Sequence, residues 1–110
     1  MLSSLNYSLI RNYRLRSKVA KVYNPLLSKL YAWVKMMVVP YEQISVYVPK
    51  KGKVLDIGCG WGILSIFLAL ECKGRNVSGI NPNLGRIASI GKILHEKPIN
   101  VQFKSSDVDA

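Results

Sequence analysis

The sequence Val54-Leu55-Asp56-Ile57-Gly58-Cys59-Gly60-Trp61-Gly62 places one acid among apolar residues and then alternates glycine with other residues. This pattern is typical of a buried strand that leaves a parallel sheet and turns tightly into a helix. Glycine permits positive φ and lets the backbone touch a ligand, while the next helix offers unpaired N–H groups. We therefore expect a ligand on this turn.

The spacing of the glycines separates the possible ligands. A dinucleotide fingerprint requires G-x-G-x-x-G, but Ile63 stands where its last glycine would fall. NAD is therefore disfavoured. A tight strand-to-helix turn that binds nothing remains the plain structural alternative.

At these residues the chain resembles the class I S-adenosylmethionine-dependent methyltransferases, whose first motif runs apolar-apolar-acid-x-Gly-x-Gly-x-Gly. The version Cys59-Gly60-Trp61-Gly62 also looks like that of cyclopropane-fatty-acid synthases and related lipid methyltransferases. The resemblance covers about residues 20–110, which is the first half of the family's sheet. It implies S-adenosyl-L-methionine as cofactor and methyl transfer to an unidentified acceptor, by a fragment or truncated form that lacks the acceptor-binding half.

Length and charge indicate a small protein with a basic front half. The 110 residues, 49% of them hydrophobic, suffice for one small core and argue against disorder. Residues 1–53 hold ten Lys or Arg and one acid, a balance of +9, whereas residues 54–110 hold six basic and five acidic residues, a balance of +1. This asymmetry favours an anionic partner, either nucleic acid or a membrane surface, or it reflects a solvated basic face.

The two cysteines, Cys59 and Cys72, form neither a disulfide framework nor a metal-ligand spacing. We expect a reducing, cytoplasmic location and no metal. Cys59 fits better as a small residue beneath a ligand than as a nucleophile, because no nearby residue in the sequence would lower its pKa.

Two helices are predicted before the glycine turn, in a basic amphipathic region of residues 1–50. Residues 1–22 contain no acid and carry apolar residues at helical spacing. A transit peptide, an arm that binds lipid or RNA, and a helix packed on the protein all remain open. Asn24-Pro25 marks a boundary before a second helix, from Leu26 to about Val39.

The apolar face of the second predicted helix is wide. Its members are Leu26, Leu30, Trp33 and Met37, with Leu27, Tyr31 and Val34 beside them. Packing on the sheet or another helix is the favoured interpretation. The aromatic residues beside Lys29 and Lys35 also suit a helix at a membrane interface.

The remainder, residues 51–110, predicts a Rossmann-like α/β fold with about three parallel strands. After a short helix or turn at 41–48 and a polar lead at 49–53, a nearly apolar helix follows the glycine turn at 63–70. Residues 73–76 are predicted as a turn and 77–80 as the second strand. A helix from Pro82-Asn83 to before Pro98 and an alternating strand from Ile99 complete the pattern.

The resemblance also assigns cofactor contacts to particular residues. The glycine turn, with Gly58, Cys59, Gly60 and Gly62, would lie against the methionine part, and Asp56 would help to hold the ammonium group. The end of the second strand, usually an acid that binds the ribose hydroxyls, is here Asn81, followed by Pro82. The pair Asp107-Val108 would contact adenine, with Asp109 as an alternative, and Tyr23 would fold back toward the methionine end.

No catalytic acid or base is predicted, because a sulfonium is already an activated methyl donor. His95, the sole histidine, is expected near a helix end. A lipid or small-molecule acceptor is favoured slightly over nucleic acid. The alternative function is a non-catalytic basic module that binds a membrane surface or RNA, with the half sheet as a remnant. Because a half sheet leaves an exposed edge, a partner chain that completes it is also expected.

Overall fold

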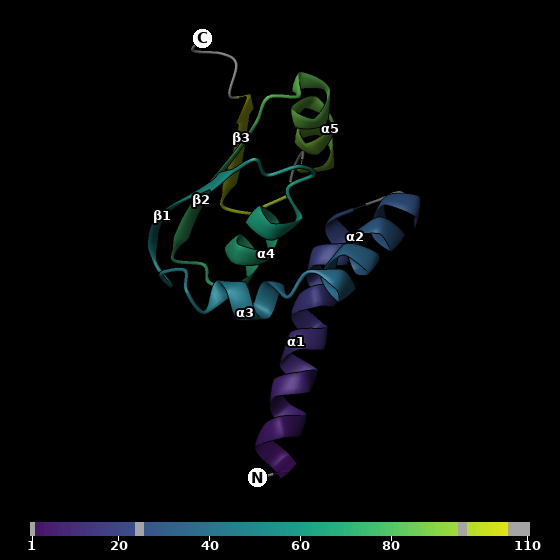
Figure 1. Cartoon of the computed structure of the whole chain (residues 1–110), viewed down its shortest axis with the longest axis vertical. Coiled ribbons are helices and arrows are strands. Elements are labelled where there is room, and N and C mark those ends of the chain that lie inside the picture. Colours follow the sequence, from purple (N-terminus) through teal and green to yellow (C-terminus); the bar gives the residue numbers. More distant parts are fainter. Residues whose placement is uncertain (1, 24–25, 95–96, 106–110) are drawn as a thin grey trace.

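The computed structural model describes residues 2–23, 26–94 and 97–105. Three parallel strands, β1 (Gly52–Ile57), β2 (Arg75–Asn81) and β3 (Val101–Ser105), form one sheet in the order β1-β2-β3. Helix α4 (Ile63–Glu71) connects the first two strands and α5 (Leu84–Leu94) the last two, as Figure 1 shows. The Rossmann-like α/β fold and the helices before it are confirmed.

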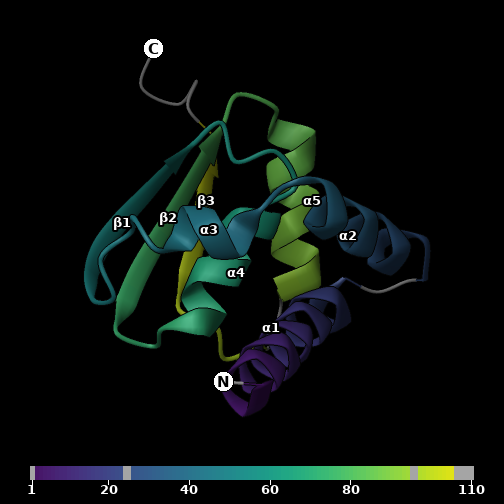
Figure 2. The same cartoon turned by 60° about the horizontal axis from the view of Figure 1, so that its bottom comes forward.

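Both connecting helices lie on the same face of the sheet (Figures 1 and 2). The strands advance in one direction from β1 to β3, and right-handed crossovers then place every helix on one side. Among the described residues nothing covers the opposite face, where the side chains of Leu55 and Ile57 are exposed. The described helices thus pack on one face of the sheet.

Three helices precede the sheet: α1 (Leu2–Val22), α2 (Leu26–Val38) and α3 (Tyr41–Ser45). The first turns of α1 project from the body of the molecule, whereas its last turns pack against α4 (Figure 1). Val19 and Ala20 of α1 belong to the same buried cluster as Ile66 and Phe67 of α4. The nearly apolar α4 is therefore covered by the sheet on one side and by the N-terminal helices on another.

The predicted packing face of α2 is wrong. Ala32 and Met36 are the buried residues of this helix, and Trp33 is partly buried beside them. Leu30, Tyr31, Val34 and Met37, which were expected to pack, are exposed. The small Ala32 lets the helix approach its neighbours closely. Helix α2 therefore buries the narrow side that carries Ala32 and Met36 and exposes most of its apolar residues to solvent.

Arg75, predicted within a turn, is the first residue of β2 and is almost fully buried. Its guanidinium donates to the backbone carbonyls of Pro49 (2.7 Å), Leu68 (3.0 Å) and Val48 (3.1 Å), among others. It also forms an ion pair with Glu71 at 2.8 Å. A buried cation is tolerated here because its N–H groups are paired.

The remaining boundaries differ by a few residues. The described part of α5 runs from Leu84 to Leu94, and β3 begins at Val101 rather than Ile99. The predicted boundary at Asn24-Pro25 and the position of His95 lie outside the described residues. None of the helices in the described ranges is both long and apolar enough to cross a bilayer.

Candidate ligand-binding site

The glycine turn between β1 and α4 has the backbone that its sequence predicts. Gly58, Gly60 and Gly62 have φ of 71°, 58° and 82°, in the left-handed region that favours glycine. A Cβ on Gly58 or Gly60 would meet no atom within 4 Å, whereas one on Gly62 would lie 2.6 Å from Cζ of Phe103. Two of the glycines therefore present open backbone, and the third is required by packing.

Backbone hydrogen bonds fix this turn at the carboxyl ends of the strands. The N–H groups of Gly58 and Cys59 both donate to the carbonyl of Ile80, at 2.9 and 3.0 Å. Helix α4 begins directly after Gly62, and the N–H groups of its first turn have no partners within the helix. Open α/β sheets bind ligands at this edge, where helix N-termini attract anionic groups.

Asp56 reaches from β1 toward the first turn of α4. Its half-buried carboxylate accepts a 2.6 Å hydrogen bond from the Ser65 hydroxyl. Burial raises the pKa of Asp56, and the hydrogen bond from Ser65 only partly offsets this effect. Ser65 was not predicted as a site residue, although it is the only polar side chain between Ile63 and Leu70 and this isolation is a signal in the sequence.

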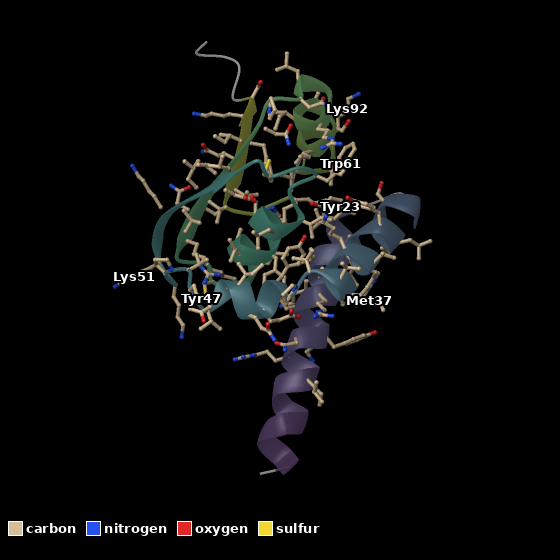
Figure 3. The ribbon with its side chains drawn as sticks, viewed as in Figure 1. Tyr23, Met37, Tyr47, Lys51, Trp61 and Lys92 are labelled. Atoms are coloured by element: carbon tan, nitrogen blue, oxygen red, sulfur yellow. The ribbon has the colours of Figure 1, made fainter. Side chains whose placement is uncertain are left out.

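Tyr23, which the resemblance predicts near the methionine end of the cofactor, contacts the glycine turn. Its buried hydroxyl donates a 2.8 Å hydrogen bond to the carbonyl of Trp61, and Figure 3 shows the two residues close together. Burial strongly raises the pKa of Tyr23, so the hydroxyl stays a neutral donor. Arg86 of α5, which no sequence pattern indicated, lies 5.5 Å from the centre of the Trp61 ring.

Cys59 is unsuited to nucleophilic chemistry. Burial, together with the negative charge of Asp56, raises the pKa of its thiol to about 11. The thiol is therefore protonated at neutral pH, whereas nucleophilic attack requires the thiolate. Within the described ranges, no group of His, Cys, Asp and Glu is arranged to hold a metal ion.

Asn81 ends β2 beside the glycine turn and is nearly buried. Its side-chain oxygen accepts the N–H of Asn83 at 2.8 Å, and the Asn83 side chain accepts the N–H of Arg86 at 3.1 Å, which starts α5. Pro82 lies exposed between the two asparagines. The predicted adenine contacts, Asp107 and Val108, and the alternative Asp109 lie outside the described residues.

The site thus combines open glycine backbone, a half-buried carboxylate and a buried tyrosine at the carboxyl edge of a parallel sheet. Residues 41–110, more than half of the chain, match the family model described as methyltransferase small domain. The chain belongs to this family. The class I methyltransferase resemblance of the glycine turn is thereby confirmed.

Solved structures support the same fold. One is the Pyrococcus abyssi tRNA (uracil-54, C5)-methyltransferase in complex with S-adenosyl-L-homocysteine, with 24% identity and a TM-score of 0.51 over 61% of this chain. Another is coclaurine N-methyltransferase bound to N-methylheliamine and S-adenosylhomocysteine, with 24% identity and a TM-score of 0.52 over 66% of this chain. YJHP from E. coli aligns with 61% of the chain at 21% identity and a TM-score of 0.50.

The aligned part is a small share of each of these proteins. It amounts to 16% of the tRNA methyltransferase, 21% of coclaurine N-methyltransferase and 29% of YJHP. No curated protein matches the sequence. The chain therefore spans less than a third of each of these proteins, and the similarity concerns the shared fold.

Proposed function

We propose that this chain binds S-adenosyl-L-methionine on the turn from Gly58 to Gly62 and serves methyl transfer. The observation that carries the proposal is the pair Gly58 and Gly60, whose positive φ and empty Cβ directions leave backbone that a ligand can touch. The family match supports it, as do the two solved methyltransferases that hold S-adenosylhomocysteine.

The surrounding residues suit the parts of this cofactor. The Asp56 carboxylate, oriented by Ser65, can accept a hydrogen bond from the ammonium group, and the first turn of α4 can bind the carboxylate. The Asn81 side chain, at the end of β2, would accept a hydrogen bond from a ribose hydroxyl. Tyr23 would act through Trp61, whose carbonyl it binds, by holding the turn in place.

The cofactor supplies an activated methyl group, so the protein has to align the acceptor with it and exclude water. We therefore assign no acid or base among the described residues. The lipid or small-molecule class of the acceptor stays a prediction.

We also propose that further polypeptide, from a longer form of this chain or from a partner chain, completes the sheet and binds the acceptor. The support comes from the described residues, which leave the sheet face with Leu55 and Ile57 uncovered and pair β1 on one side only. An unpaired edge can form hydrogen bonds with a further strand, and an apolar face can be covered by further helices.

The cofactor proposal is tested by calorimetric titration with S-adenosylmethionine and S-adenosylhomocysteine. Gly60→Arg fills the open turn, and Gly91→Arg is the matched control, because a Cβ on Gly91 of α5 also meets nothing within 4 Å. We expect saturable binding to the wild type and to Gly91→Arg, and its loss in Gly60→Arg. A folded wild type that binds neither compound, or undiminished binding by Gly60→Arg, would contradict the proposal.

A further inference from the structure

Helix α2 presents a continuous apolar stripe to the outside. The exposed large side chains are Leu30, Tyr31, Val34, Met37 and Val38. Their spacing places them on one side of the helix, opposite the buried Ala32 and Met36. Such a stripe is unusual for a helix that packs on a protein core, because its packing side is normally its most apolar side.

The stripe continues onto α1. Tyr13 of α1 lies against Trp33 of α2, with ring centroids 5.8 Å apart, and Leu9, Ile10 and Tyr13 are themselves exposed. We call the exposed apolar side chains of both helices the α1–α2 apolar surface. They are Leu9, Ile10, Tyr13, Leu30, Tyr31, Val34, Met37 and Val38. Figure 3 shows Met37 on the side of the molecule formed by these helices, away from Tyr47 and Lys51. A contiguous exposed apolar area marks an interaction surface.

The charge of the two helices is entirely positive. Residues 1–41 contain no Asp or Glu, so nothing on α1 or α2 offsets their cations. Arg16 forms an ion pair with Glu42. The other cations form no ion pair within the described part of the chain, and they are Arg11, Arg14, Lys18, Lys21, Lys29 and Lys35.

We propose that the α1–α2 apolar surface docks on an anionic lipid membrane, with the helices lying in the interface. The charge selects this occupant, because the cations complement an anionic surface while leucine, valine and methionine side chains enter the acyl boundary. Trp33, Tyr13 and Tyr31 are the amphipathic residues that interfaces favour. The proposal is independent of cofactor binding.

The test measures co-sedimentation of the full chain with vesicles of phosphatidylcholine alone and with about 30% phosphatidylglycerol. We expect binding to the anionic vesicles that weakens as salt is raised, and at least about tenfold weaker binding to neutral vesicles. The double variant Val34→Ser/Met37→Ser should lose binding to anionic vesicles by about tenfold, because two apolar side chains no longer enter the acyl region.

The sheet provides a matched control. Val34 and Met37 are 57% and 74% exposed, and Leu55 and Ile57 are 58% and 75% exposed on the uncovered sheet face. Leu55→Ser/Ile57→Ser therefore removes equally exposed apolar side chains elsewhere and should bind vesicles as the wild type does. Circular dichroism checks that each variant keeps its helices.

A second measurement needs no destabilising change. Brominated acyl chains should quench the tryptophan fluorescence of the bound protein, and this quenching should persist in Trp61→Phe and be lost in Trp33→Phe.

Three results would overturn the proposal: no preference for anionic vesicles, equal losses in the two double variants, or binding that Val34→Ser/Met37→Ser leaves intact. The last result would mean that the cations alone hold the chain on the anionic surface, as they would on a polyanion such as RNA. A wild type that ignores vesicles but dimerises through the stripe would assign the surface to a second copy.

Discussion

Asp56 carries a negative charge that the fold itself does not favour. Its carboxylate is half-buried with Ser65 as its hydrogen-bond donor, and burial raises its pKa. In a protein selected only for stability, an amide would serve better at this position. A carboxylate at this position agrees with the proposed role of Asp56, which is to accept a hydrogen bond from the ammonium group of the cofactor.

Asp56→Asn should therefore raise the thermal denaturation midpoint at pH 7 and weaken S-adenosylmethionine binding by about tenfold, because a charge-assisted hydrogen bond is lost. The Asn oxygen can still accept the Ser65 hydroxyl. A variant that is less stable at pH 7, or that binds equally well in calorimetry, would contradict this role.

The same variant has a defined pH dependence. The folded pKa of Asp56 is raised, so its ionised form costs stability at neutral pH, and this cost disappears as the pH falls below the unfolded value of about 3.9. Thermal melts from pH 7 to pH 3 should show the advantage of Asp56→Asn shrinking toward zero. An advantage that grows on acidification would have the wrong sign.

Asn81→Asp should tighten S-adenosylmethionine binding about fivefold. One carboxylate oxygen would keep the N–H of Asn83, and the other would offer a charged acceptor to the ribose. Asn76→Asp is the matched control, since it adds the same charge to the exposed opposite end of β2. Equal or poorer binding by Asn81→Asp in calorimetry would show that Asn81 does not face the ribose.

At the scale of elements, two glycines of the turn differ in what an added side chain would meet. Gly60 and Gly62 both have positive φ, so alanine is strained at either position. Only at Gly62 would the new Cβ also meet the Phe103 ring, at 2.6 Å. Gly62→Ala should thus be less stable than Gly60→Ala by about 1 to 3 kcal/mol in urea unfolding. Equal losses would mean that Phe103 moves aside freely.

The sequence predicts best those elements whose local residue pattern is compatible with only one secondary structure and one degree of burial. Strands β1 and β2 and helix α4 follow from the glycine turn and from a helix too apolar to be exposed. The orientation of α2 could not be predicted from the sequence, because its apolar residues cover a wide arc of the helix. Tertiary packing buries the side with Ala32 and Met36. Arg75 was also missed, since a turn-like Lys73-Gly74 gives no sign of a buried guanidinium.

At the scale of the whole molecule, Arg75 joins the segments at the amino ends of the strands. Its guanidinium binds carbonyls of residues 45, 48, 49 and 68, which lie in α3, the loop before β1 and α4. This end lies opposite the glycine turn. The hydrogen bonds of Arg75 therefore stabilise the sheet from the end opposite to the glycine turn.

Arg75→Lys should lower the free energy of unfolding by about 2 to 4 kcal/mol, because an ammonium group cannot reach all of these acceptors and leaves buried groups unpaired. Arg14→Lys is the control, as Arg14 is exposed and lies outside the ion pairs of the described residues. Urea unfolding of both variants measures the difference, and similar midpoints would contradict a structural role for Arg75.

The hydrogen bond from Tyr23 to Trp61 connects the end of α1 to the turn across 38 residues of sequence. A ligand that orders the turn should therefore also stabilise the end of α1. Because coupling free energies are reciprocal, a stabilised end of α1 should favour ligand binding by the same amount. Amide protons in the last turn of α1 should exchange more slowly when the turn is occupied. In Tyr23→Phe, which lacks this hydrogen bond, occupation of the turn should slow that exchange less.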